Sequence, residues 1–152
     1  MTDKVKNDWK SASGQRAAFL EKVESLIPWN RWRIFIASRL SDRDYGIPQA
    51  QTDILLRIYV LKELHSIPDD SLEFIEYELS ESPAFGKFAK VAPDGTGFPG
   101  YDMLRRFFSF MRTSGTGKVL MTDFNGVLKD AGLALRREPV KTVAFTPKQR
   151  GK

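Results

Sequence analysis

The segment from Thr52 to Leu64 carries the strongest helical pattern in the chain. Its apolar residues recur at steps of three and four, so they share one face of a helix, and its charged residues lie on the other face. The apolar residues are Ile54, Leu55, Ile58, Leu61 and Leu64, and the charged ones are Arg57, Lys62 and Glu63. This pattern predicts a long amphipathic helix that forms the centre of the core.

Six further segments show helical spacing between breaks of proline, glycine or serine. Pro28 ends the first of them, because the residue before a proline avoids helical geometry, and Ser82-Pro83 supplies a favoured cap and first helical residue. The predicted helices span about residues 16–27, 29–40, 72–79, 83–90, 102–112 and 119–131. The one candidate strand is 140–145. The expected fold class is therefore all-α, a compact multi-helix domain with a helix-turn-helix-like segment and a disordered basic C-terminal tail.

The positive charge of the chain is concentrated at its C-terminal end. The 152 residues carry a formal net charge of +5. Residues 136–152 hold Arg136, Arg137, Lys141, Lys148, Arg150 and Lys152 against Glu138, so this segment alone contributes +5 and residues 1–135 sum to zero. We expect a flexible arm (1–15), a helical domain (16–135) and a basic tail (136–152). Such a tail either attracts phosphate without sequence preference or is a solvated terminus with no partner.

The chain lacks the residue types on which most metal and thiol chemistry depends. It has no cysteine and a single histidine, His65, which excludes disulfides, thiolate sites and multi-histidine zinc ligation. Without a nucleophile–base pair or a ligand cluster, we expect no metal, no cofactor and no enzymatic activity. No apolar run approaches the roughly 18 residues that cross a bilayer, and the N-terminus is too polar for a signal peptide. The sequence thus predicts a cytoplasmic protein without membrane contact.

Residues 67–108 contain three short helical segments in an order that suggests a helix-turn-helix type of nucleic-acid reader. The first segment is acidic and repels phosphate, so the groove-reading role falls to the third, 102–112. The residues expected to contact DNA are Tyr101, Arg105, Arg106, Ser109 and Arg112, with Lys87, Arg136 and Arg137 as further cations. The alternative is a peripheral helix whose arginines form surface ion pairs.

The acidic first segment favours a different kind of partner. Asp69, Asp70, Glu73 and Glu76 belong to a run of carboxylates with no basic residue between His65 and Lys87. Such a run is most simply a solvated face, but it can also contact a basic protein. Together with the neutral charge of residues 1–135, it supports an alternative function: a protein–protein interaction module, either an adaptor or an inhibitor, without sequence-specific DNA binding.

Several motifs occur in the order found in a known family. They are Tyr45-Gly-Ile-Pro48 before the leucine-rich segment, Ile67-Pro-Asp-Asp-Ser-Leu-Glu73 before Ser82-Pro-Ala-Phe85 and Phe88, Pro99 before Leu104, Arg106 and Phe107, and Phe124 and Leu128 before Ala131-Gly-Leu-Ala-Leu-Arg-Arg-Glu138. Across residues 19–138 this order resembles the N-terminal module of insertion-sequence DDE transposases of the InsH-like group.

The resemblance implies a bacterial protein derived from a mobile element. In that family the first catalytic aspartate follows a lead-in like the one ending at Glu138, yet residues 140–145 contain no acid. The chain then stops before the ribonuclease-H-like fold whose carboxylates hold two metal ions. We therefore expect a catalytically inactive regulator of transcription or transposition. Its expected partners are double-stranded DNA and, beyond DNA, a related transposase or another protein; a homodimer is left open.

Overall fold

The computed structural model describes residues 12–40, 45–137 and 143–147, with the backbone alone described at positions 12, 13, 136, 137 and 144. Its elements are α2 (Ala12–Leu26), α3 (Trp29–Leu40), the 3-10 helix η2 (Gln49–Gln51), α4 (Thr52–Leu64), α5 (Leu72–Glu81), α6 (Pro83–Ala89), α7 (Tyr101–Thr113), α8 (Thr116–Asp130), β1 (Leu133–Arg137) and β2 (Val143–Pro147). Helices dominate and the strands form one small hairpin, which confirms the predicted all-α class.

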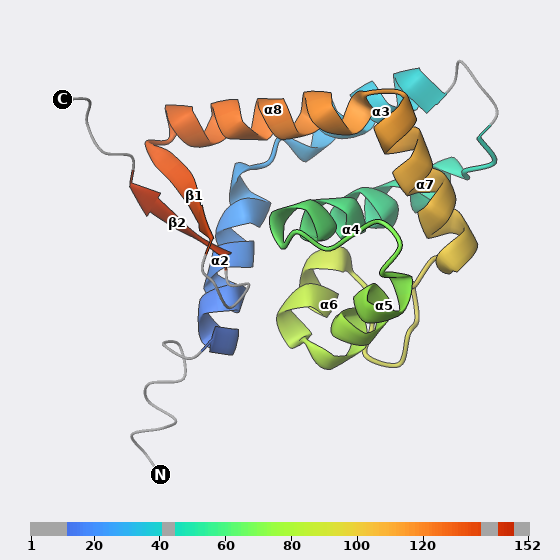
Figure 1. Ribbon diagram of the computed structural model, residues 1–152, viewed down its shortest axis with the longest axis horizontal. Coiled ribbons are helices and arrows are strands. Elements are labelled where there is room, and N and C mark those ends of the chain that lie inside the picture. The colour runs from blue at the N-terminus through green and yellow to red at the C-terminus, as the bar shows by residue number, and fades with distance from the viewer. Residues whose placement is uncertain (1–11, 41–44, 138–142, 148–152) are drawn as a thin grey trace, which may run out of the picture.

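The helices surround α4, as Figure 1 shows. Helix α8 runs along one side of the molecule with α3 beside it, and α7 meets the start of α8 at a steep angle. Helices α5 and α6 lie on the opposite side of α4, and α2 packs against α6 and the hairpin. The core at the centre includes Trp32, Leu56, Phe107, Phe108 and Phe124, each almost fully buried. One core therefore unites the helical elements and the hairpin.

Helix α4 is buried around almost its whole circumference, including positions where the sequence predicted a charged face. Arg57 is only 3% exposed and Lys62 only 4%. The Arg57 guanidinium contacts Glu24 at 2.5 Å and donates to the Phe88 carbonyl at 3.0 Å. Buried charges are tolerated when they are paired and hydrogen-bonded, which these contacts accomplish. The predicted polar face is in fact a second buried face.

The helix boundaries follow the sequence prediction closely in the centre of the chain and less closely at the ends. Helices α3 and α4 span the predicted residues. Helix α2 begins at Ala12, so part of the predicted flexible arm is helical, and residues 1–11 lie outside the described residues. Helix α8 begins at Thr116, three residues before the predicted start, because Gly115 adopts the left-handed conformation (φ +76°) that ends one helix and admits the next.

The described C-terminal residues differ from the predicted tail. Strands β1 and β2 pair antiparallel, with Leu135 opposite Phe145 and Arg137 opposite Val143. Val143 is buried, and the ring centroids of Phe145 and Phe19 lie 4.7 Å apart. The domain therefore extends beyond the predicted boundary at residue 135, and the strand begins three residues after the predicted one. Residues 138–142 and 148–152, which hold the rest of the predicted tail, lie outside the described residues.

Among the described residues, no helix combines the length and the hydropathy needed to cross a membrane. Within the same part of the chain, no three histidine or acidic side chains gather as they would around a metal ion.

Candidate nucleic-acid interface

Helix α7 buries one face in the core and presents a narrow polar one. Leu104, Phe107, Phe108, Phe110 and Met111 are buried in the core. The helix starts after Gly100, whose φ of +95° only glycine adopts readily. The polar face must therefore be built from the residues between those apolar positions.

The polar face of α7 forms one wall of a groove whose other wall belongs to α5 and the segment before it. The groove has a volume of about 730 Å³ and an apolar floor that includes Leu72 and Phe108. Its polar lining consists of Asp69, Asp70, Glu73, Tyr101, Arg105, Ser109 and Arg112. One groove thus brings together the residues predicted to contact DNA and the residues predicted to contact a protein partner.

Contacts within and beside this groove compensate much of the charge on α7. The Arg112 Nη1 atom lies 2.6 Å from Asp69 Oδ2, and the Tyr101 hydroxyl donates to Glu76 Oε1 at 2.5 Å. The hydrogen bond to Glu76 is the main reason that the pKa of Tyr101 rises to about 12. Arg106 pairs with Asp102 at 3.1 Å and donates to the Gly46 carbonyl at 3.3 Å. The face therefore offers less net positive charge than its three arginines suggest.

Asp69 connects this groove to the centre of the molecule. One of its carboxylate oxygens contacts Lys62 of α4 at 2.7 Å, and the other contacts Arg112 of α7 at 2.6 Å. Lys62 also lies over the rings of Tyr59 and Phe108, at 5.2 Å and 5.4 Å from their centroids. The largely exposed side chain of Arg112 is therefore linked by an ion pair to the segment before α5.

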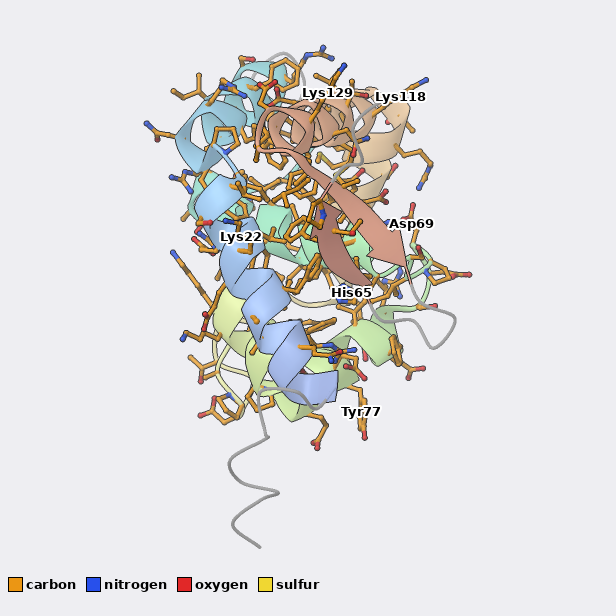
Figure 2. The ribbon with its side chains drawn as sticks, turned by 90° about the vertical axis from the view of Figure 1, so that its left-hand side faces the viewer. Lys22, His65, Asp69, Tyr77, Lys118 and Lys129 are labelled. Carbon is orange, nitrogen blue, oxygen red and sulfur yellow. The ribbon has the colours of Figure 1, made fainter. Side chains whose placement is uncertain are left out.

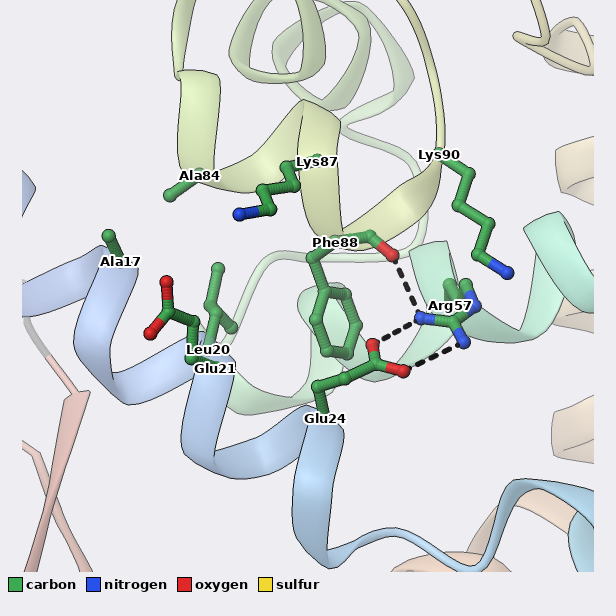
Figure 3. A pocket seen from close by; sticks show the side chains of 9 residues that line it. All are labelled: Ala17, Leu20, Glu21, Glu24, Arg57, Ala84, Lys87, Phe88 and Lys90. Carbon is green, nitrogen blue, oxygen red and sulfur yellow. Dashed lines mark hydrogen bonds and ion pairs between the residues drawn. The ribbon is translucent and has the colours of Figure 1, made fainter.

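Lys87, the cation predicted from α6, lies in a different place. It lines a cavity of about 270 Å³ between α2, α4 and α6, shown in Figure 3. There it shares the lining with Leu20, Phe88 and the Glu24–Arg57 ion pair. The structure does not bring Lys87 together with the α7 residues.

The two arginines predicted from the tail belong to β1. Arg136 is paired with Ala144 and Arg137 with Val143 in the hairpin register. Only the backbone is described at these two arginines, so their predicted DNA contacts lie outside the described side chains.

A short link joins α7 to α8. Only Ser114 and Gly115 separate the two helices. The Ser114 hydroxyl donates to the Phe110 carbonyl at 2.6 Å and accepts from the Thr116 amide at 3.2 Å, and the Ser114 carbonyl accepts from Arg39 at 3.2 Å. Helices α7 and α8 therefore meet steeply at a two-residue turn that contains a glycine.

The start of α8 is held against α4 by close packing. Gly117 faces the Tyr59 side chain so closely that a Cβ atom at this position would overlap the tyrosine hydroxyl. Farther along, the Trp32 indole N–H donates to Asp123 Oδ2 at 2.7 Å, and Arg31 contacts the same oxygen at 2.7 Å. Burial opposes ionisation of Asp123, but these hydrogen bonds outweigh it and lower the pKa of the carboxyl. The start and the middle of α8 are thus held by the rest of the fold.

The outer face of α8 carries polar residues that the sequence motifs assigned to no site. Lys118, Thr122, Asn125 and Lys129 are exposed on it. Figure 2 places Lys118 and Lys129 at one edge of the molecule, away from Asp69 and Tyr77. The available signal was the spacing of these four residues, which recur at helical steps on one face.

A comparison with known proteins gives the family. No curated protein and no solved structure matches the chain. The family described as Transposase domain (DUF772) matches residues 7–109, which is more than half of the chain. This agrees with the resemblance seen in the sequence motifs. The chain belongs to the DUF772 family of transposase domains.

Proposed function

We propose that this chain is a double-stranded DNA-binding protein that regulates transcription or transposition and carries out no strand transfer itself. The observation that carries the proposal is the steep α7–α8 pair, joined by two residues, in a member of a transposase-domain family, and we interpret this pair as helix-turn-helix-like. In such pairs the first helix crosses the DNA backbone and the second enters the major groove. Binding without chemistry is supported by residues 140–145, which supply no carboxylate.

Within this proposal the α7 arginines contact phosphates. Arg105 and Arg106 are exposed and adjacent, so they diverge by about 100° around the helix and can reach two different phosphates. Phosphate contacts position a protein on DNA without reading its sequence. The basic residues after 147 add attraction of the same kind.

The test is binding of fluorescein-labelled duplexes drawn from a randomised library, measured by anisotropy at about 50 mM and about 200 mM salt. We expect binding at the lower concentration and a loss of about tenfold or more at the higher one. Substituting Lys148, Arg150 and Lys152 with serine should weaken all duplexes alike. These substitutions keep the hairpin, whereas deleting residues 136–152 would remove the buried Val143. Absence of binding to any duplex at low salt would contradict the proposal.

A second candidate function rests on α5. Its side chains Phe74 and Tyr77 are 46% and 59% exposed, beside Glu73 and Glu76. Aromatic rings surrounded by carboxylates suit a lysine- or arginine-rich protein segment, because cations bind both groups. An adaptor or inhibitor of a related transposase could use this surface. Substituting Phe74 and Tyr77 with serine should then abolish co-purification of a stoichiometric protein partner and leave DNA binding unchanged.

A further inference from the structure

We infer that the outer face of α8, formed by Lys118, Thr122, Asn125 and Lys129, is the surface that enters the major groove of double-stranded DNA. The inference rests on the proposed function and adds the element and side chains that make the contact. It moves the reading role away from α7, where the sequence analysis placed it. Four properties of α8 support it: the arrangement of the side chains, their chemistry, the surrounding charge and the rigidity of the helix.

The four side chains share a narrow strip. At about 100° per residue, positions 118, 122, 125 and 129 fall within an arc of about 60°. The strip is about 16 Å long at 1.5 Å per residue, a length that fits along a stretch of major groove. Its residues are exposed, while Leu120, Phe124 and Leu128 anchor the opposite face in the core. The whole strip is therefore accessible to one straight ligand.

The chemistry of the strip matches the edges of base pairs. The asparagine amide can pair with adenine through two hydrogen bonds, the threonine hydroxyl can bond to several bases, and lysine binds guanine or phosphate. Val119, beside the strip, is 45% exposed and offers methyl groups to a thymine methyl. Gly126, also beside it, has open space where a Cβ atom would be, so packing does not explain a glycine inside this helix. Glycine there leaves room for the DNA backbone to approach.

The charges around α8 favour phosphate more than those around α7 do. The α7 groove is lined by three carboxylates, Asp69, Asp70 and Glu73, against two arginines, Arg105 and Arg112. On α8 the acidic residues are Asp123, which is engaged by Arg31 and Trp32 of α3, and Asp130 at the last helical position. The α8 strip itself carries two lysines and no acid, so it attracts phosphate, whereas in the groove the carboxylates outnumber the arginines by one.

The helix is also held in place before any ligand arrives. The short link to α7, the close packing of Gly117 on Tyr59 and the Trp32–Asp123 hydrogen bond fix its position. A surface that does not need to be ordered on binding loses less entropy when it binds. The α8 strip is therefore preorganised as a rigid reading helix.

The experiment compares Lys118→Ala and Lys129→Ala with Lys22→Ala, which removes the same charge from an exposed position on α2. Anisotropy is measured on the best duplex selected from the randomised library, across a salt series. The α8 double variant should weaken binding about tenfold or more and reduce the salt slope by about two, whereas Lys22→Ala should change neither. Melting curves confirm that the exposed substitutions leave the fold intact.

Asn125→Ala and Gly126→Ala test the recognition of base pairs rather than the electrostatic attraction of the DNA backbone. Asn125→Ala should reduce the preference for the selected duplex over a random one by about fivefold or more, with little change in the salt slope. Gly126→Ala should preserve or raise stability yet weaken specific binding. If the wild type binds DNA but the α8 variants bind as the wild type does, or if Arg105→Ala with Arg106→Ala removes the preference instead, the inference fails and the proposed function stands. If the wild type binds no duplex, both fail.

Discussion

Helices α4 and α8 each carry two cations, yet the fold uses the two pairs in opposite ways. Arg57 and Lys62 of α4 are buried and contact carboxylates from other segments. Lys118 and Lys129 of α8 are exposed along one edge of the molecule. The difference teaches that a cation on an amphipathic helix reveals its role only through what packs against it. The following changes test this contrast, from the largest expected effect to the smallest.

Replacing Arg57 with alanine should produce the largest loss of stability. The change would leave Glu24, Asp53 and the Phe88 carbonyl without the guanidinium that they contact. Removing one partner of a buried ion pair is strongly destabilising, but Glu24 is partly exposed, so we expect a loss of about 2–4 kcal/mol. Urea unfolding followed by circular dichroism measures it, with Arg105→Ala as an exposed control expected to change little. If Arg57→Ala lowers the free energy of unfolding no more than Arg105→Ala does, the contacts of Arg57 do not stabilise the fold.

Two glycines of α8 form a matched pair for the next test. Gly117→Ala places a methyl group against the Tyr59 hydroxyl, so we expect about 1–3 kcal/mol of destabilisation from overpacking. Gly126→Ala meets open space and should stabilise by about 0.5–1 kcal/mol, because alanine favours the helix. The free energy of unfolding in urea distinguishes them. Equal effects at both positions would show that α8 does not pack on α4 as described.

Acid should weaken the buried ion-pair region around α4. Burial opposes ionisation of Asp53, but the charges of Arg57, Arg33 and Lys90 outweigh it and hold its pKa below the ordinary 3.8. A lowered pKa in the folded state means that the stabilisation is present above the ordinary value and is lost as pH falls through the folded one. The stability difference between wild type and Asp53→Asn should therefore shrink between about pH 5 and about pH 2. If the stability difference between wild type and Asp53→Asn instead grows on acidification, the result contradicts a lowered pKa of Asp53 in the folded state.

The smallest expected change in stability belongs to the exposed pair. Lys118→Ala with Lys129→Ala should alter the free energy of unfolding by less than about 0.5 kcal/mol, as is usual for surface substitutions. Lys62→Ala provides the contrast, because it removes a buried ammonium that contacts Glu63 and Asp69. If the α8 double variant unfolds as easily as Lys62→Ala, the exposed lysines have a structural role that their positions do not suggest.

Local patterns in the sequence predicted the fold better than they predicted the site. The apolar spacing in α3 and α4 gave both helices their described bounds, because that spacing depends only on neighbouring residues. The burial of Arg57 depends on Glu24, which lies 33 positions away, and no local pattern contains that information. For the same reason the sequence treated Asp69 and Arg112 as parts of alternative sites, although they are in contact across 43 positions.

The link between α7 and α8 shows a different source of error. Residues 113–117 contain two glycines, which are typical of a helix end. Only Gly115 has the left-handed backbone that ends a helix, whereas Gly117 is helical and allows α8 to approach Tyr59. Glycine serves both purposes, and the choice between them depends on tertiary packing. The start of α8, and with it the place of Lys118 on this helix, was therefore hidden from the sequence, whereas the other strip residues fall within the predicted helix 119–131.

The family match ends at residue 109, inside α7, but the folded unit does not. A shorter protein that kept only the matched segment would leave Trp32 without the acceptor Asp123 and Phe19 without the ring of Phe145. The segment that matches the family, residues 7–109, is thus smaller than the segment that folds as one unit, which also includes α8 and the hairpin. Recombination that exchanged residues at that boundary would divide a single hydrophobic core between two parents.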